Sequence, residues 1–119
     1  MAGESLFIGW GAVARGREKA ALQVFQETIE YYGKLQQEGR IERFDPYLLA
    51  PHGGDLNGFI VLHGERQALA EIRFSDEFEQ LLARASAIVD ALGVIPAYSG
   101  EALGRQMERY QQVADEFGG

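Results

Sequence analysis

The apolar residues of this chain follow two kinds of spacing that alternate from one segment to the next. Runs in which apolar residues are consecutive or alternate with polar ones predict strands over residues 6–10, 41–50, 57–64 and 94–99. Apolar residues three and four positions apart predict helices over residues 17–39, 75–92 and 101–117. A short piece around residues 68–72 lies between the third strand and the second helix.

This order, βαββαβ followed by a C-terminal helix, is the split βαβ arrangement of the ferredoxin-like fold. Its four-stranded antiparallel sheet has the strand order 4-1-3-2, so strands two and four are the edges. Proline is tolerated on edge strands because it cannot donate a hydrogen bond to a neighbouring strand. Pro46 and Pro96 lie in the second and fourth predicted strands. The sequence therefore predicts a single ferredoxin-like α+β domain over residues 1–119.

Both faces of the predicted sheet are apolar. The third strand places Phe59 and Val61 on one face and Ile60 and Leu62 on the other, and the first and fourth strands behave in the same way. The two crossover helices cover only one face, so the second face should read polar at every other residue. An uncovered apolar sheet would exceed the patches that monomers usually expose. Either the last helix or a second copy of the chain must cover it.

This two-faced pattern over residues 6–99 resembles the dimeric α+β barrel proteins, a ferredoxin-like superfamily in which two sheets face each other. The resemblance implies a homodimer, with a small organic ligand held between sheet and helices or inside the barrel of the dimer. The superfamily includes cofactor-independent monooxygenases, isomerases, haem-binding enzymes and proteins without an assigned activity. Because a shared fold does not carry chemistry with it, no catalytic residue is transferred to this chain.

Charge and composition exclude several classes of partner. The net charge is −7 and the 11 Lys and Arg residues are scattered, which disfavours nucleic acid and anionic membrane surfaces. No apolar run is long enough to span a bilayer, and the opening segment MAGESLFIGW lacks the features of a signal peptide. The chain has no cysteine, which removes disulfides, thiolate catalysis and cysteine-based zinc sites. We therefore expect a cytoplasmic protein.

The segment GAVARGRE, residues 11–18, has the glycine spacing of a phosphate-binding loop. Gly11 and Gly16 match the two glycines of that motif, and Arg17 stands where it has lysine. Glu18 occupies the position of the magnesium-binding hydroxyl, and its carboxylate would repel a phosphate. We therefore interpret the glycines as turn residues after the first strand.

The predicted topology brings several chemically useful side chains to one end of the sheet. Trp10 and Arg15 follow the first strand, and His52 and Asp55 lie in the hairpin between strands two and three. An aromatic ring, a guanidinium, an imidazole and a carboxylate would suit a small polar or anionic molecule. The same hairpin residues are also ordinary turn formers, so a purely structural role stays open.

The second histidine, His63, ends the third strand at the opposite end, near Tyr98. Facing the barrel, it would serve as a general base or as a haem or metal ligand, and otherwise it is a hydrogen-bonded strand end. Two histidines eleven positions apart give little support for a metal site, so we predict no metal and no cofactor.

Three functional hypotheses follow. The leading one is a homodimer that binds a small organic molecule in an apolar cavity. The second is a cofactor-independent monooxygenase or isomerase for a small aromatic or lactone-like substrate, in which His52 or His63 moves a proton and Trp10 and a tyrosine shape the pocket. The third is a non-catalytic protein interaction module that uses the second apolar face.

Overall fold

A computed structural model describes residues 4–118. Eight elements follow in the order β1 (Glu4–Trp10), α1 (Glu18–Gln37), β2 (Arg43–Leu48), β3 (Gly58–Gly64), α2 (Arg66–Arg73), α3 (Asp76–Ser86), β4 (Gly93–Tyr98) and α4 (Gly100–Glu116). All predicted strands and helices are present. The short piece around residues 68–72 belongs to the additional helix α2.

The strand order of the sheet is β2-β3-β1-β4, and every neighbouring pair is antiparallel. This is the predicted order 4-1-3-2 counted from the other edge. Pro46 and Pro96 lie on the edge strands β2 and β4, where no ladder hydrogen bond is lost. The ferredoxin-like fold and its C-terminal helix are confirmed.

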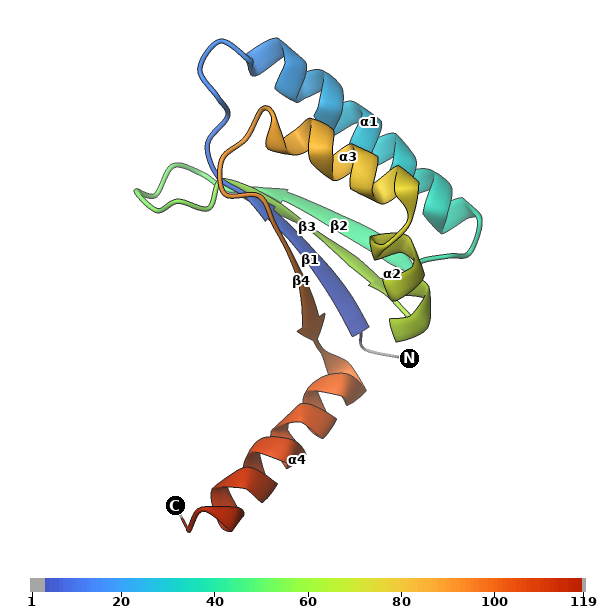
Figure 1. The fold of residues 1–119 in the computed structure, drawn as a ribbon, viewed down its shortest axis with the longest axis vertical. Coiled ribbons are helices and arrows are strands. Elements are labelled where there is room, and N and C mark those ends of the chain that lie inside the picture. Colours follow the sequence, from blue (N-terminus) through green and yellow to red (C-terminus); the bar gives the residue numbers. More distant parts are fainter. Residues whose placement is uncertain (1–3, 119) are drawn as a thin grey trace.

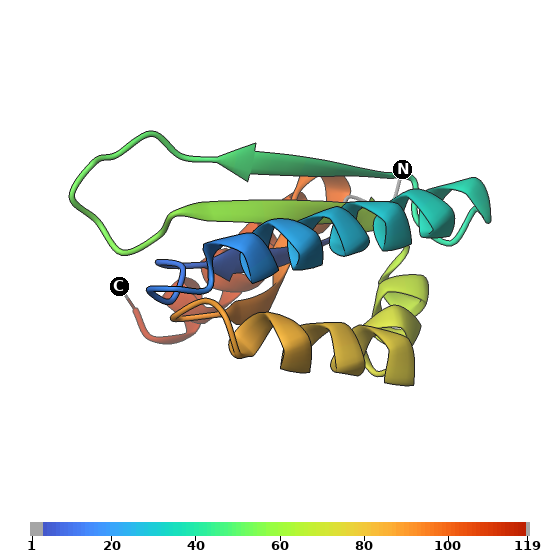
Figure 2. The same ribbon diagram turned by 90° about the horizontal axis from the view of Figure 1, so that it is seen from above.

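Helices α1 and α3 lie side by side on one face of the sheet, and α2 packs beyond one end (Figures 1 and 2). The hydrophobic core fills the space between this helical layer and the sheet. Its largest fully buried side chains come from both layers: Tyr32, Leu35, Ile60, Leu62, Ile72 and Phe78. Apolar residues of alternate strand positions thus meet one stripe of each helix, as their spacing predicts.

Helix α3 is shorter than the predicted segment 75–92. It begins as expected, because the Ser75 hydroxyl accepts a hydrogen bond from the backbone N–H of Phe78 at 3.3 Å. It ends at Ser86, because the following residues pair with the loop after β1. Val13 and Val89 form an isolated antiparallel bridge there, and the N–H of Gly11 donates to the carbonyl of Asp90 at 2.7 Å.

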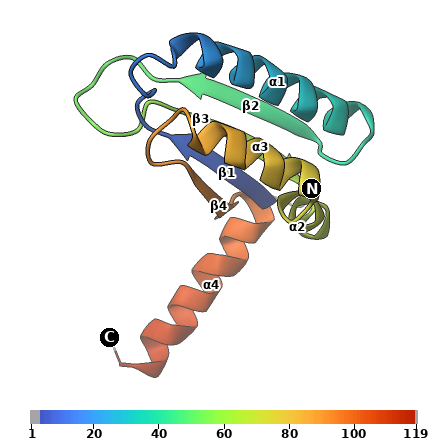
Figure 3. The same cartoon turned by 45° about the horizontal axis from the view of Figure 1, so that its top comes forward.

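Helix α4 extends away from the rest of the chain (Figures 1 and 3), and with it the molecule measures 54 × 38 × 23 Å along its principal axes. Only Ala102 of this helix is buried. Its large apolar side chains, and that of Phe117 at its end, are 47–79% exposed: Leu103, Met107, Tyr110, Val113 and Phe117. The last helix therefore does not cover the second face of its own sheet.

Candidate functional site

The face of the sheet away from α1 and α3 carries a row of aromatic residues. Phe59 of β3 stacks on Phe7 of β1 at a ring-centroid distance of 5.1 Å, and on Tyr47 of β2 at 4.9 Å. Val61 lies beside Phe7 in the register, and Ile95 of β4 follows on the other side. These five side chains are the apolar part of this face, which we call the open face, and no helix among residues 4–118 covers it.

A polar chain crosses one end of the open face. The Nε2 of His63 lies 3.0 Å from Oδ2 of Asp45, which also accepts a hydrogen bond from Nε of Arg43 at 3.2 Å. Because a carboxylate only accepts, Nε2 donates the hydrogen of this contact, and in the neutral form of the ring Nδ1 is then an acceptor. That Nδ1 lies 3.4 Å from the hydroxyl of Ser5, and Ser5 lies 3.4 Å from the hydroxyl of Ser99.

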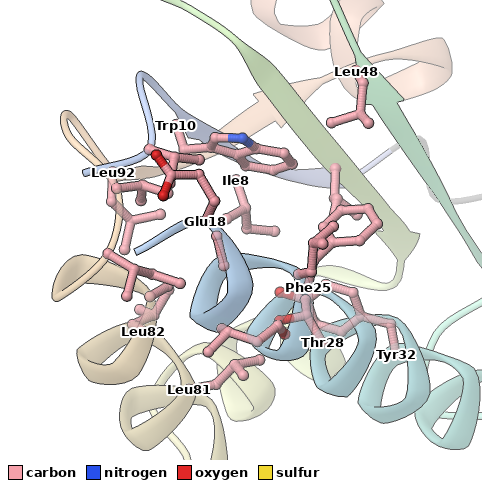
Figure 4. Close-up of a pocket in the computed structure, with 18 residues that line it drawn as sticks. Ile8, Trp10, Glu18, Phe25, Thr28, Tyr32, Leu48, Leu81, Leu82 and Leu92 are labelled. Carbon is pink, nitrogen blue, oxygen red and sulfur yellow. The ribbon is translucent and has the colours of Figure 1, made fainter. Parts of the chain in front are cut away.

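A cavity of about 420 Å³ lies on the opposite side of the sheet, between β1, α1 and α3. Figure 4 shows Trp10 and Ile8 on its sheet side and Leu81 and Leu82 on the side of α3. Apart from Glu18 and Thr28, the side chains that line it are apolar or aromatic: Ile8, Trp10, Val13, Ala21, Leu22, Val24, Phe25, Tyr32, Leu48, Ile60, Leu81, Leu82, Ala85, Ile88, Val89 and Leu92. Such a cavity falls in the size range of small-molecule sites.

Few polar groups reach this helix–sheet cavity. The hydroxyl of Thr28 donates to the carbonyl of Val24 at 2.7 Å, so it is already used inside α1. Burial, with a smaller contribution from Tyr31, raises the pKa of Tyr32, so its hydroxyl stays protonated. The Glu18 carboxylate and the indole N–H of Trp10 are thus the groups best suited to orient a bound molecule (Figure 4).

Trp10 is held in the cavity wall by its neighbours in the sheet and in α1. Its ring meets Phe25 edge-on at a centroid distance of 6.1 Å. On the neighbouring strand it lies opposite Gly58, where a Cβ atom would come within 2.5 Å of the indole Cζ2. Only glycine leaves room for the indole at this register position.

The loops that we predicted to meet at the end of β1 do meet there, as their backbone contacts show. The N–H of Asn57 donates to the carbonyl of Trp10 at 2.8 Å, and the carbonyl of Asp55 lies where a Cβ on Gly11 would clash, 2.9 Å away. The loop after β1, the β2–β3 hairpin and the loop before β4 therefore meet at one end, at the upper left of Figure 1.

The side chains of the candidate residues at this end do not gather into one site. His52 is used within its own hairpin, because Nε2 lies 2.7 Å from the Leu56 carbonyl and Nδ1 accepts from the N–H of Gly54 at 3.2 Å. Arg15 and Asp55 are exposed, and neither forms an ion pair with a described residue. Trp10 points to the helix side of the sheet, whereas His63 lies on the open face.

In the loop after β1, the carboxylate of Glu18 accepts a hydrogen bond from a backbone N–H that could otherwise bind an anion. Gly16 adopts a φ of +85°, and its N–H donates to the carboxylate of Glu18 at 3.3 Å. In a phosphate-binding loop such N–H groups face the phosphate. The acidic side chain that follows takes this position, which fits the interpretation of the glycines as turn residues.

Among residues 4–118, no helix is both long and apolar enough to cross a membrane. Within the same range, no three His, Asp or Glu side chains gather closely enough to hold a metal ion.

Solved structures of low sequence identity share this fold. A dimeric ferredoxin-like protein of unknown function from Bacteroides fragilis is 11% identical, with a TM-score of 0.58 over 81% of this chain and 96% of its own. A conserved protein from Methanosarcina mazei is 13% identical, with a TM-score of 0.61 over 82% and 93%. SnoaB, a cofactor-independent oxygenase from Streptomyces nogalater, is 13% identical, with a TM-score of 0.60 over 82% and 94%. The likeness is one of fold.

The sequence itself matches no protein-family model and no curated protein. The ferredoxin-like fold that the resemblance implies is confirmed by these structures. The activity of the similar proteins does not follow from that architecture, so the site has to be argued from its own side chains.

Two residues that contact or neighbour His63 were not predicted. Ser5 and Asp45 had no feature of their own in the sequence, and they reach His63 only through the register of β1 and β2 against β3. If the register is known, Ser5, Phe7 and His63 can be assigned to one face of the sheet, because they stand at alternate positions of paired strands. The helix–sheet cavity was expected from the resemblance as one of two places for a ligand, but its lining residues were not predicted, because they depend on how closely α1 and α3 approach the sheet.

Proposed function

We propose that this protein binds a small, mainly apolar organic molecule in the helix–sheet cavity. The observation that carries the proposal is the cavity of about 420 Å³, open to solvent and lined almost entirely by apolar side chains. A water-filled space of this composition is costly, because apolar surface stays in contact with water. A ligand with an apolar body and one polar group near Glu18 or Trp10 would remove that cost.

We also propose that the protein is a cytoplasmic homodimer in which two open faces form a barrel. Two apolar surfaces support this, since both the open face and the exposed stripe of α4 lack a covering element within residues 4–118. The similar protein from Bacteroides fragilis is described as dimeric. The lack of cysteine fits a reducing compartment.

Trp10 offers a direct test of ligand binding, because it is the sole tryptophan and lines the cavity. Titration with 1-naphthol, as a planar apolar probe with one hydroxyl, should change the Trp10 fluorescence in a saturable way. Replacement of Ala85 by leucine fills part of the cavity from α3. We expect it to weaken binding of the probe at least tenfold, because a change of a few methyl groups in an apolar pocket has an effect of this size. Native mass spectrometry would identify a molecule retained from the cell.

The matched control is Ala83→Leu, which adds the same side chain to an exposed position of α3 outside the cavity. This variant should bind like the wild type. Equal affinity in the wild type and in Ala85→Leu would mean that the probe binds elsewhere. A wild type that binds neither the probe nor any retained molecule would exclude ligand binding in the cavity.

A second candidate function is cofactor-independent oxygenase or isomerase chemistry on a small aromatic or lactone-like substrate. The specific observation in its favour is the pairing of His63 with Asp45, which orients the imidazole so that Nδ1 can accept a proton on the open face. One structurally similar protein is a cofactor-independent oxygenase. A substrate would then lie in the barrel between two copies, not in the helix–sheet cavity.

Histidine variants distinguish this candidate. His63→Ala should abolish turnover of phenols, quinones or lactones, while His52→Ala should keep it, because His52 is bonded within its own loop. Asp45→Asn should shift the pH dependence of turnover, because it removes the charge that orients the ring. Turnover retained in His63→Ala would exclude the histidine-based mechanism.

A further inference from the structure

A second pocket of about 470 Å³ lies at the other end of the sheet and shares no residue with the helix–sheet cavity. It is formed where α2, the start of β1, the end of β4 and the first turns of α4 meet (Figure 1). Four of the 11 basic residues of this acidic chain line it: Arg66, Arg73, Arg105 and Arg109. We call it the arginine pocket.

The arginine pocket contains a single acidic residue. Glu4 is 15% exposed in its side chain and pairs with Arg105, whose Nη2 lies 3.3 Å from the carboxylate. Four formal positive charges therefore face one negative charge, although the whole chain has a net charge of −7. Positive charges gathered in one pocket repel one another, and an anionic occupant would relieve that repulsion.

The positive charge is concentrated toward Arg73 and Arg109. Arg66 and Arg105 also border a shallower groove that contains three further glutamates, so their charge is shared with neighbouring acids. Arg109 instead donates to the amide of Gln106 at 3.1 Å, and Arg73 donates to the carbonyl of Val94 at 3.5 Å. Neither forms an ion pair with a described residue.

Arg73 is further positioned by an aromatic ring. Its guanidinium carbon lies 5.5 Å from the centroid of Phe74, within the range of a cation–π contact. The rest of the pocket surface is largely apolar or aromatic: Leu6, Leu69, Ala70, Phe74, Pro96, Tyr98 and Ala102. The pocket thus combines planar cationic groups with an apolar floor.

We propose that the arginine pocket binds a small organic acid, with its oxyanion on Arg73 and Arg109 and its apolar part against Leu6 and Pro96. Guanidinium groups bind carboxylate and phosphate oxygens in a bidentate manner, which suits an oxyanion better than a simple halide. The apolar floor requires an occupant with a carbon body. This site is independent of the ligand proposed for the helix–sheet cavity.

Calorimetric titration of the whole chain with phenylacetate, phenyl phosphate and inorganic phosphate tests this proposal. Phenylacetate or phenyl phosphate should bind in a saturable way and more tightly than inorganic phosphate, and binding should weaken as salt is added. Arg109→Gln should weaken binding at least fivefold, and Arg109→Lys should recover only part of it, because lysine lacks the planar fork. Whichever organic anion binds more tightly identifies the oxyanion as carboxylate or phosphate.

The matched control is Arg17→Gln, which removes the same charge at the opposite end of β1 and should leave the affinity unchanged. Ala85→Leu should also leave it unchanged, which separates this site from the helix–sheet cavity. Because Arg109 is exposed on α4, its replacement should not disturb folding, and Arg73→Gln provides a second variant from another helix. Wild-type affinity in both arginine variants, or equal binding of inorganic phosphate, would overturn the proposal.

Discussion

Gly58 is the residue on which the position of Trp10 depends. A Cβ atom at Gly58 would lie 2.5 Å from the indole Cζ2 and 2.9 Å from the backbone carbonyl of Tyr47. The carbonyl belongs to the β2–β3 ladder and cannot easily move, so the indole has to shift into the cavity. We expect Gly58→Ala to lower the free energy of unfolding by about 1–3 kcal/mol, as overpacking does, and to change the Trp10 fluorescence.

The control for this prediction is Gly64→Ala in the same strand and on the same face. At Gly64 the nearest atom to an added Cβ is the Cα of Ile41 at 3.6 Å, an ordinary contact. Alanine there should be neutral or raise the free energy of unfolding by about 0.4–1 kcal/mol, because it restricts the unfolded chain. Urea unfolding followed by Trp10 fluorescence measures both variants, and equal stabilities would show that the indole is free to move.

At the scale of elements, Ser75 sets where α3 begins. Its hydroxyl accepts from the N–H of Phe78 and donates to the carbonyl of Ile72 at 2.7 Å, so it connects the end of α2 to the start of α3. Ser75→Ala should lower the free energy of unfolding by about 1 kcal/mol, a usual cost of losing an N-terminal cap. Thermal unfolding by circular dichroism measures the loss.

Ser86→Ala is the matched variant for Ser75→Ala. Ser86 ends the same helix, and its hydroxyl donates to the carbonyl of Ala83 at 2.9 Å without accepting from a free N–H group. Replacing Ser86 should lower the free energy of unfolding clearly less than replacing Ser75 does. A larger loss for Ser86→Ala would mean that the stability of α3 depends on its end and not on its cap.

The elements were largely predictable because they depend on local spacing. The succession of elements and the start of α3 after Ser75 follow from short-range patterns, and the ferredoxin-like topology that this succession indicates places Pro46 and Pro96 on edge strands. The end of α3 could not be predicted in this way, because the residues after Ser86 form hydrogen bonds with the loop at Gly11, which is distant in sequence. The same limit applies to Asp45, whose contact with His63 depends on strand register.

The predicted cluster of Trp10, Arg15, His52 and Asp55 shows a further limit of sequence reasoning. Topology correctly brought the backbone of these loops to one end of the sheet. It could not give the direction of each side chain, which depends on hydrogen bonds inside the loop, such as those of His52 to Gly54 and Leu56. A ligand role for these residues stays a prediction that the helix–sheet cavity supports for Trp10 alone.

At the scale of the whole molecule, two apolar surfaces point outward from a chain of only 119 residues. The open face presents stacked aromatic rings, and α4 presents a stripe whose side chains are roughly half exposed or more. One partner that covered both surfaces would explain why each is apolar without contributing to the core of its own chain. A second copy of the chain meets this condition, since it brings an equal open face and an equal helix.

Ile95→Lys tests that explanation, because Ile95 is 55% exposed on the edge strand β4 and lies opposite Phe7. A lysine there costs the isolated chain little but places a charge in the proposed interface, so we expect the dimer to weaken at least tenfold. Leu22→Lys adds the same charge to an exposed position of α1, on the other side of the sheet, and should leave the dimer intact.

Sedimentation velocity over a range of concentrations reports the assembly of the wild type and both variants. A dimeric wild type, a dimeric Leu22→Lys and a monomeric Ile95→Lys would assign the interface to the open face. A dimer of unchanged affinity in Ile95→Lys would move the interface to α4, because that helix carries the other uncovered apolar surface. A wild type that stays monomeric at every concentration would exclude the barrel, and with it any chemistry of His63 that needs two facing sheets.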